Sequence, residues 1–563
     1  MKVLEALASA IAAEGIDHIF TVMGDANQDI IVELCEKHGL KYVPAHHETS
    51  AVGMADGYAR FSGKIGLAST TQGPGYTNAT TSLVLARLHR SPVLMLAGHA
   101  SLRDPYNPQG MVDQHALAKL TTEATAKIDH AGAIDYCIGE AFRQLKAKKG
   151  PFVLNMPQDV QHSIVPDENW KYRPMYKAQA SQPPRREDID EAARILADAK
   201  RPTILCGLGA AQGKAEAEVR ALAEYLGAPV ATSLFAVGFC AQYPLYLGLS
   251  GGLGSDLTVD TLADSDVMIV VGASLNEWTT HFGKILENGK KIIQIDDRPD
   301  AFGWFARITV GLEADAKVAV AALLDRLQES RKPARQPDAA TAQKIKQYKP
   351  PEINYDDGKS VDPRRAAAYL EDKLPKPGRI LVVDGGHVAM VAYQALSSPS
   401  ADDWTSGQDF GAMAQGLSIA LGACFARPGK RVTHVTGDAS FMMNVADFHT
   451  AVSHNLPLTV FVFNDNALGQ ERHDMVHKGF PTKYAEVAEP DFEKLAVAFG
   501  AKGFRVNRPD DFGEIDKALA VENGPVIVNV RINGDVELPV SWEIAQRISM
   551  TGEGNGRARR RAA

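Results

Sequence analysis

Short apolar runs alternate with helix-like segments over the first 180 residues. Apolar runs at residues 42–45, 65–70 and 92–98 predict strands, and the segments 49–61 and 76–89 between them predict helices. Strands that alternate with helices indicate a parallel sheet with helices on both faces.

The same alternation occurs in two further parts of the chain, which predicts an α/β fold of three domains. Strands are expected at residues 203–207, 267–273 and 291–296, and again at 379–386, 431–438, 458–465 and 525–532. Polar, Pro-containing stretches at 179–188 and 329–351 separate these groups. We therefore expect three doubly wound parallel-sheet domains at 1–180, 188–330 and 355–545, with a linker at 331–354 and a Gly- and Arg-rich tail at 546–563.

Length and composition are typical of a multidomain globular protein. The 563 residues exceed what one core organises, and 45% of them are hydrophobic. The net charge of −8 argues against a general nucleic-acid binder, and a solvated terminus is a simpler interpretation of the basic tail than a nucleic-acid tether. The sequence has no apolar run of membrane-spanning length, no signal-peptide pattern and no C-x-x-C pair among its five cysteines. A cytoplasmic protein without a membrane partner is expected.

Two aspartates follow consecutive predicted strands of the last domain. Asp438 and Asp465 are 27 residues apart, which is one strand–helix–strand unit. The carboxyl ends of parallel strands meet at one edge of a sheet, so the two carboxylates can converge on a hard cation such as magnesium. The small residues Ala439 and Ser440 leave room for a diphosphate. The alternative is that Asp438 only caps a helix.

Glu48 ends a predicted strand of the first domain. Ala51, Val52 and Ala55 surround it with apolar groups as the next helix begins. A desolvated carboxyl group is suited to share a proton with a weakly basic ring nitrogen. The alternative is a glutamate that only favours the helix dipole in the first turn.

These segments together resemble thiamine-diphosphate enzymes of the acetolactate synthase, benzaldehyde lyase and 2-oxo acid decarboxylase type. Residues 437–465 resemble the thiamine-diphosphate motif, with Ala439 in place of a glycine and Asp465 in place of an asparagine. Residues 46–60 resemble the family's Arg–His–Glu segment, with His46 in place of the arginine. Residues 70–78, 384–390 and 406–423 resemble further family motifs in the same order.

The resemblance implies a role for each matching residue. Glu48 would hydrogen-bond the pyrimidine ring of thiamine diphosphate, and Met413 would hold the cofactor in its bent form. Asp438, Asp465 and the backbone oxygen of Ala467 would bind Mg²⁺, with Asn464 as the substitute ligand. His46, His47 and Gln109 would move protons or bind substrate oxygens. The remaining residues expected at the cofactor are Gly73, Gly75, Gly386, His387, Gly437, Ala439, Ser440 and Leu468.

The reaction and assembly are also expectations from the resemblance. Residues 273–278 lack the two arginines of the flavin-dependent synthases, so FAD is not expected. Asp474 stands where those synthases have a tryptophan, which favours a hydroxylated or charged substrate. The first interpretation is an acetolactate synthase-like carboligase or lyase that acts on a small carbonyl substrate, a 2-oxo acid or 2-hydroxy ketone. The alternatives are a 2-oxo acid decarboxylase that releases an aldehyde and a catalytically silent binding protein. A dehydrogenase is disfavoured because no G-x-G-x-x-G motif opens a strand–helix turn.

The family forms a homodimer or homotetramer with its active sites between subunits. The small-residue helix that contains Gly53 and Gly57 and the helix at 416–423 are expected at that interface.

Overall fold

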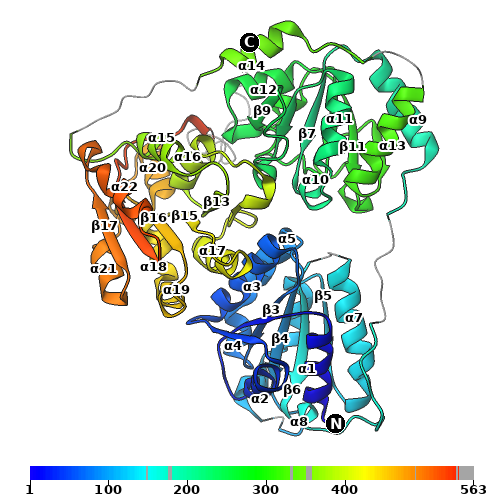
Figure 1. Ribbon diagram of the computed structural model, residues 1–563, viewed down its shortest axis with the longest axis vertical. Coiled ribbons are helices and arrows are strands. Elements are labelled where there is room, and N and C mark those ends of the chain that lie inside the picture. The colour runs from blue at the N-terminus through cyan, green and yellow to red at the C-terminus, as the bar shows by residue number, and fades with distance from the viewer. Residues whose placement is uncertain are drawn as a thin grey trace.

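The structure is a computed structural model that describes residues 1–104, 106–147, 150–174, 181–329, 334–349, 358–488, 490–540 and 543. These residues form three six-stranded sheets whose paired strands run parallel, each with helices packed against it (Figure 1). The predicted α/β class is confirmed. None of the helices in the described ranges is both long and apolar enough to cross a bilayer.

The first sheet has the strand order β2-β1-β3-β4-β6-β5. Its buried strands come from apolar runs that need no polar face, because helices cover both sides. The strands are β1 (His18–Thr21), β2 (Lys41–Pro44), β3 (Gly66–Thr70), β4 (Val93–His99), β5 (Ala124–Lys127) and β6 (Phe152–Pro157). The main helices of this domain are α1 (Val3–Ala13), α3 (Glu48–Ser62), α5 (Thr80–Leu88), α6 (Gln114–Thr121) and α7 (Ile134–Lys146).

The second sheet has the order β12-β11-β10-β7-β8-β9. Its strands are β7 (Pro202–Cys206), β8 (Val230–Thr232), β9 (Tyr246–Leu249), β10 (Val267–Val271), β11 (Lys291–Asp296) and β12 (Val310–Glu313). The helices of this domain include α9 (Arg186–Asp198), α10 (Leu208–Gln212), α11 (Glu216–Leu226), α12 (Asp256–Ala263) and α13 (Ala316–Glu329).

The third sheet has the order β14-β13-β15-β16-β18-β17. Its strands are β13 (Ile380–Val383), β14 (Trp404–Ser406), β15 (Val432–Gly437), β16 (Leu458–Asn464), β17 (Lys502–Val506) and β18 (Val526–Arg531). The helices include α15 (Pro363–Lys373), α16 (His387–Ala395), α17 (Gln415–Ala426), α18 (Asp438–Met443), α19 (Phe448–Ser453), α20 (Gly469–Lys478), α21 (Phe492–Phe499) and α22 (Gly513–Leu519).

Two segments differ from their sequence-based predictions. The helix expected at 76–89 is divided into α4 (Pro74–Asn78) and α5, which meet at Ala79. The segment interpreted as a linker contains α14 (Ala339–Gln347), which begins where Asp338 accepts a hydrogen bond from the Thr341 N–H. Only Ala342 and Ile345 of this polar helix pack against the second domain, and both are partly buried, so its apolar face is too small for a hydrophobic pattern to reveal. The tail at 546–563 lies outside the described residues.

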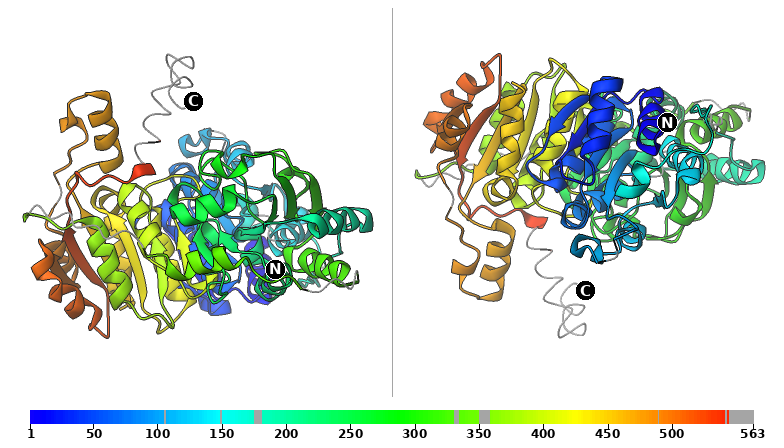
Figure 2. Two further views of the ribbon diagram at one scale, coloured as in Figure 1. Left: turned by 90° about the horizontal axis from the view of Figure 1, so that it is seen from above. Right: turned by 90° about the horizontal axis from the view of Figure 1, so that it is seen from below.

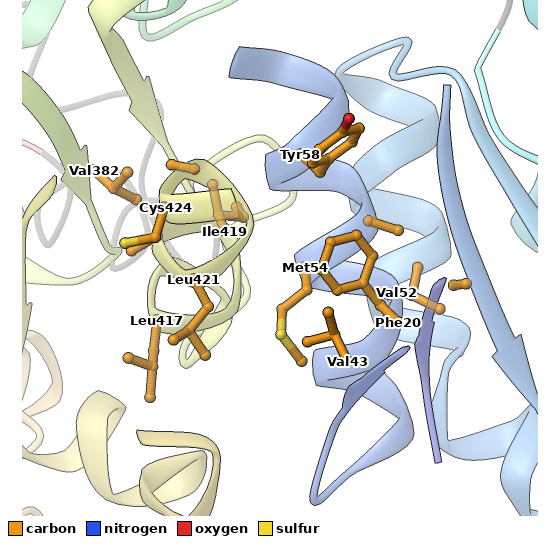
Figure 3. Close-up of a cluster of buried hydrophobic side chains, with 14 of the residues drawn as sticks. Phe20, Val43, Val52, Met54, Tyr58, Val382, Leu417, Ile419, Leu421 and Cys424 are labelled. Carbon is orange, nitrogen blue, oxygen red and sulfur yellow. The ribbon is translucent and has the colours of Figure 1, made fainter. Parts of the chain in front are cut away.

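Helices α3 and α17 pack against each other and join the first domain to the third. The two domains lie side by side in both views of Figure 2, and Figure 3 shows their side chains meeting at the junction. A Cβ atom added to Gly57 would lie 2.2 Å from the backbone oxygen of Ile419, and one added to Gly422 would lie 2.2 Å from that of Met54. The small residues permit close helix approach, as expected, and within this chain the two helices meet each other. Their place at an interface between subunits stays a prediction.

Candidate active site

A cavity of about 830 Å³ opens at the carboxyl ends of β13, β15 and β16. Asp438 follows β15, Asp465 follows β16, and these strands are neighbours in the third sheet. Both aspartates line the cavity, as the strand-end argument predicts. The other sequence-predicted residues on its wall are Gly386, His387, Met413, Gly437, Ala439, Ser440, Ala467 and Leu468.

The two aspartates present buried oxygens without partners. Oδ2 of Asp438 and Oδ2 of Asp465 have no hydrogen-bond partner. Burial raises the pKa of Asp438. Burial and the neighbouring charge of Asp438 raise the pKa of Asp465 to about 7. Two desolvated carboxylates side by side are costly unless a cation neutralises them, so this pair fits a hard divalent ion.

His387 opens α16 at the same edge of the sheet. It follows Gly386, which has a φ of +95° that favours glycine. Burial, reinforced by the charges of His473 and Arg472, lowers the pKa of His387 to about 3. The imidazole is therefore neutral, and its buried Nε2 has no hydrogen-bond partner. A neutral ring with a free nitrogen beside a helix N-terminus fits a diphosphate oxygen.

Met413 is held by its neighbour in the chain. Ala414 adopts the left-handed region, with a φ of +70°. Its N–H donates to Oγ of Ser440 at 2.7 Å, and its carbonyl oxygen accepts from Nδ2 of Asn444 at 3.0 Å. Ser440 also donates to Asp384 at 2.6 Å. The side chain of Ser440 therefore braces the cavity wall, a role that the sequence does not reveal.

Asn464, the substitute metal ligand, has its side chain engaged elsewhere. Its Nδ2 donates to Asn529, and its Oδ1 accepts from Arg531 at 2.8 Å. Asn464 does not belong to the cavity wall, whereas Asp465 does. Asp465, and not Asn464, therefore has a side chain that can reach a cation in the cavity.

The residues around Glu48 form a second group, which lies apart from the cavity at the carboxyl ends of strands in the first domain. Oε2 of Glu48 accepts from Nδ2 of Asn78 at 3.0 Å, and a Cβ added to Gly75 would lie 3.5 Å from its Oε1. Gly73, with a φ of +61°, would bring a Cβ to 2.7 Å from the backbone oxygen of Gln109. Gln109 is exposed and its side chain accepts from that of Gln72 at 2.7 Å.

The two histidines before Glu48 have structural contacts. Nδ1 of His47 accepts from the Thr49 N–H, which caps α3. The His46 N–H donates to Asp447 of the third domain at 2.7 Å. The backbone that carries Glu48 is therefore held by a carboxylate 401 residues away in the sequence.

Glu48, His47 and Gln109 do not line the cavity that contains Asp438. The structure thus gathers the predicted residues into two groups on different domains. Sequence reasoning missed three residues that contact members of these groups: Asp384 beside Ser440, His473 beside His387 and Asp447 beside His46. Asp384 directly follows β13, so the strand-end rule that found Asp438 could also have found it.

Comparisons with known proteins agree with this geometry. Residues 1–118 match the N-terminal TPP binding domain of thiamine pyrophosphate enzymes, residues 189–323 the central domain and residues 384–530 the C-terminal TPP binding domain. A probable acetolactate synthase large subunit from Methanocaldococcus jannaschii is 28% identical over 96% of this chain and 93% of its own length.

Two further relatives have similar coverage. The sulfoacetaldehyde acetyltransferase of Castellaniella defragrans is 28% identical over 90% of this chain and 89% of its own. The acetolactate synthase large subunit of Haemophilus influenzae is 25% identical over 94% of both chains. The chain therefore belongs to the thiamine pyrophosphate enzyme family, in its acetolactate synthase-like group, and is a thiamine-diphosphate-dependent enzyme that makes or breaks carbon–carbon bonds.

Proposed function

We propose that the protein is a magnesium-dependent carboligase or lyase that acts on a 2-oxo acid or a 2-hydroxy ketone, in the manner of an acetolactate synthase. The observation that carries this proposal is the pair of buried carboxylates, Asp438 and Asp465, with unpartnered oxygens in one cavity. The names of the relatives, acetolactate synthase and sulfoacetaldehyde acetyltransferase, support a reaction that forms an acetolactate-like product or transfers an acetyl group.

The metal would be held by few protein groups. Among the described residues, no set of three or more His, Cys, Asp or Glu side chains forms a metal cluster. Asp438, Asp465 and the backbone oxygen of Ala467 would therefore share Mg²⁺ with diphosphate oxygens, as magnesium sites commonly do. His387 and the first N–H groups of α16 would bind the diphosphate.

Thiamine diphosphate supplies the electron sink that allows the bond next to a carbonyl to break or form. The role of Glu48 would be to hold a proton against the pyrimidine nitrogen, with Asn78 fixing the orientation of its carboxyl group. Gln109 would bind a substrate oxygen, since it is exposed beside Gly73. His46 and His47 hold the turn before Glu48 through the contacts described above, so we assign them an orienting role.

The wall nearest α20 favours a polar substrate. Gln470 and Glu471 line the cavity, and Oε1 of Gln470 is buried without a partner. A site with an unpaired amide discriminates strongly for a ligand that can hydrogen-bond to it. This supports a hydroxylated carbonyl compound as the second substrate.

The experiment is to incubate the cofactor-loaded protein with a panel of 2-oxo acids and 2-hydroxy ketones, with and without aldehyde acceptors, and to identify the products by mass. The proposal predicts a condensed 2-hydroxy ketone from a 2-oxo acid, or cleavage of a 2-hydroxy ketone. Release of a free aldehyde as the sole product would instead identify a simple decarboxylase. Consumption of no 2-oxo acid or 2-hydroxy ketone would contradict the proposal.

We further propose that the active enzyme is at least a homodimer in which Glu48 of one chain faces Asp438 of another. Support comes from the separation of the two groups, because Glu48 does not line the cavity of its own chain. Two inactive variants, Glu48→Gln and Asp438→Ala, can be mixed under conditions that let subunits exchange. Recovered activity is expected, with one intact site in each mixed dimer. No recovery despite demonstrated exchange would contradict the arrangement.

A further inference from the structure

A buried cluster of charges joins the first and third domains beside the cavity. On α3, Arg60 makes a two-pronged contact with Asp56, at 2.8 and 2.7 Å. The same guanidinium reaches the third domain and donates to Oδ2 of Asp409 at 3.1 Å. The other oxygen of Asp409 accepts from Nδ1 of His89 at 2.8 Å.

The cluster is shielded from solvent. The side chains of Arg60, Asp56 and Asp409 are 3%, 0% and 2% exposed. Burial acts to raise the pKa of Asp409, but the charges of His89 and Arg60 hold it below the ordinary value. Charge-assisted bonds in such a desolvated place are strong, and the loss of one partner leaves the other charge uncompensated.

His89 lies where all three domains meet. Its ring packs edge-on against Phe235 of the second domain, with 5.4 Å between ring centroids. Its backbone oxygen accepts from the side chain of Gln212 at 3.1 Å. The imidazole therefore has little freedom to leave Asp409.

Asp409 belongs to the segment 407–413, which connects β14 to α17. Gln408, Asp409, Phe410, Gly411 and Met413 all line the cavity. At the far end, Ser440 and Asn444 fix Ala414, as described above. At the near end, Arg60 donates to the backbone oxygen of Ser406 at 3.0 Å. The segment is thus tied down at both ends. At its near end, a backbone hydrogen bond from Gly407 to Val383 of the third domain is joined by the contacts from Arg60 and His89 of the first domain.

We propose that Arg60 and His89 are positioning residues that fix Asp409 and thereby hold segment 407–413, with Met413, in the conformation that binds the cofactor. This inference rests on the cofactor binding in the cavity. Helix α3 would then have two roles, because its first residue is Glu48, the proposed partner of the pyrimidine ring, and its last turn carries the positioning residue Arg60. If sites lie between subunits, each end of α3 serves a different cofactor.

The test replaces His89 in two ways. His89→Phe keeps an aromatic ring against Phe235 but removes the N–H donor. His89→Asn retains an N–H donor in a similar place. The dissociation constant of thiamine diphosphate, measured by equilibrium dialysis at fixed Mg²⁺, is expected to rise on the order of tenfold in His89→Phe, the usual scale for a lost hydrogen bond to a charged group. It should stay within about twofold of wild type in His89→Asn.

Arg379 provides a matched control. It is a buried arginine of the third domain, pairs with Glu371, and does not line the cavity. Arg379→Lys is expected to lower the thermal midpoint while leaving cofactor affinity unchanged. If Arg379→Lys weakens binding as much as His89→Phe, general loosening of the domain explains the effect and the inference is wrong.

The remaining outcomes are also decisive. Wild-type affinity in folded His89→Phe would overturn the inference. If His89→Phe does not fold, the near-isosteric Asp409→Asn variant takes its place, with the same expected loss and the same contradiction. If wild type itself binds no thiamine diphosphate, the cofactor assignment fails instead.

Discussion

Replacement of Gly57 by alanine tests the packing that joins the first and third domains. Gly57 lies within α3 and faces Ile419 of α17. An added Cβ would lie 2.2 Å from the backbone oxygen of Ile419 and 2.7 Å from its Cα. An ordinary carbon–oxygen contact is about 3.3 Å, so the helices must separate by about 1 Å.

The energetic cost follows from that displacement. Overpacking a tight contact typically costs about 1–3 kcal/mol, and we expect the upper end because the obstacle is backbone that cannot rotate away. Alanine gains up to about 1 kcal/mol of helix propensity over glycine. The net loss for Gly57→Ala is therefore about 2 kcal/mol.

Two comparisons isolate the contact. Gly53→Ala, on the same helix, meets the side chain of Ser418, with Oγ at 2.3 Å, so its cost should be smaller. Gly513→Ala, at an exposed position in the first turn of α22, has nothing within 4 Å and should be neutral or slightly stabilising. Urea unfolding followed by circular dichroism gives the three midpoints. The packing argument fails if Gly57→Ala unfolds at the wild-type midpoint or later than Gly53→Ala.

Three further predictions concern the site and its surroundings. Asp438→Ala should weaken retention of thiamine diphosphate by about 100-fold or more, because loss of a direct metal ligand exceeds the effect of outer-shell changes. Dialysis against Mg²⁺ and cofactor measures this, and wild-type retention would contradict it. Because the pKa of Asp409 is lowered in the folded state, its contribution to stability is present above the unfolded pKa of about 4 and is lost as pH falls toward the folded value. Asp409→Asn should therefore be less stable than wild type at pH 7 and should lose less stability on acidification. Urea midpoints measured at several pH values check this, and a difference between the two proteins that stays the same at every pH would refute it. Purified protein should carry no stoichiometric flavin, since the cavity segment 273–278 contains no arginine, and a flavin band that persists through purification would overturn this.

The sequence predicted three parallel sheets and many of their buried strands, but not every strand. The partly buried strands β5, β9 and β17 were missed because they are not continuous apolar runs. Strands such as β10 (Val267–Val271) are continuous apolar runs, which only a covered parallel sheet needs. The placement of Asp438 and Asp465 in one cavity followed from the same reasoning, because strand ends in a parallel sheet share an edge.

Contacts between residues far apart in the chain could not be predicted in this way. The bond between Arg60 and Asp409 spans 349 residues, and periodicity contains no information about such a pair. The glycines of α3 predicted a close helix neighbour but not whether it belongs to the same chain. The polar helix α14 was missed because it buries no apolar stripe.

Exchange of the cofactor's C2 proton with solvent deuterium reports directly whether Glu48 of this chain activates thiamine diphosphate while Asp438 and Asp465 hold its metal-bound diphosphate. Quenched-flow exchange, read by NMR of the released cofactor, should be fast in the wild-type protein loaded with Mg²⁺. It should be slower by about 100-fold or more in Glu48→Gln, the scale of a lost acid–base group. Exchange at the wild-type rate in a folded, cofactor-saturated Glu48→Gln protein would contradict the account.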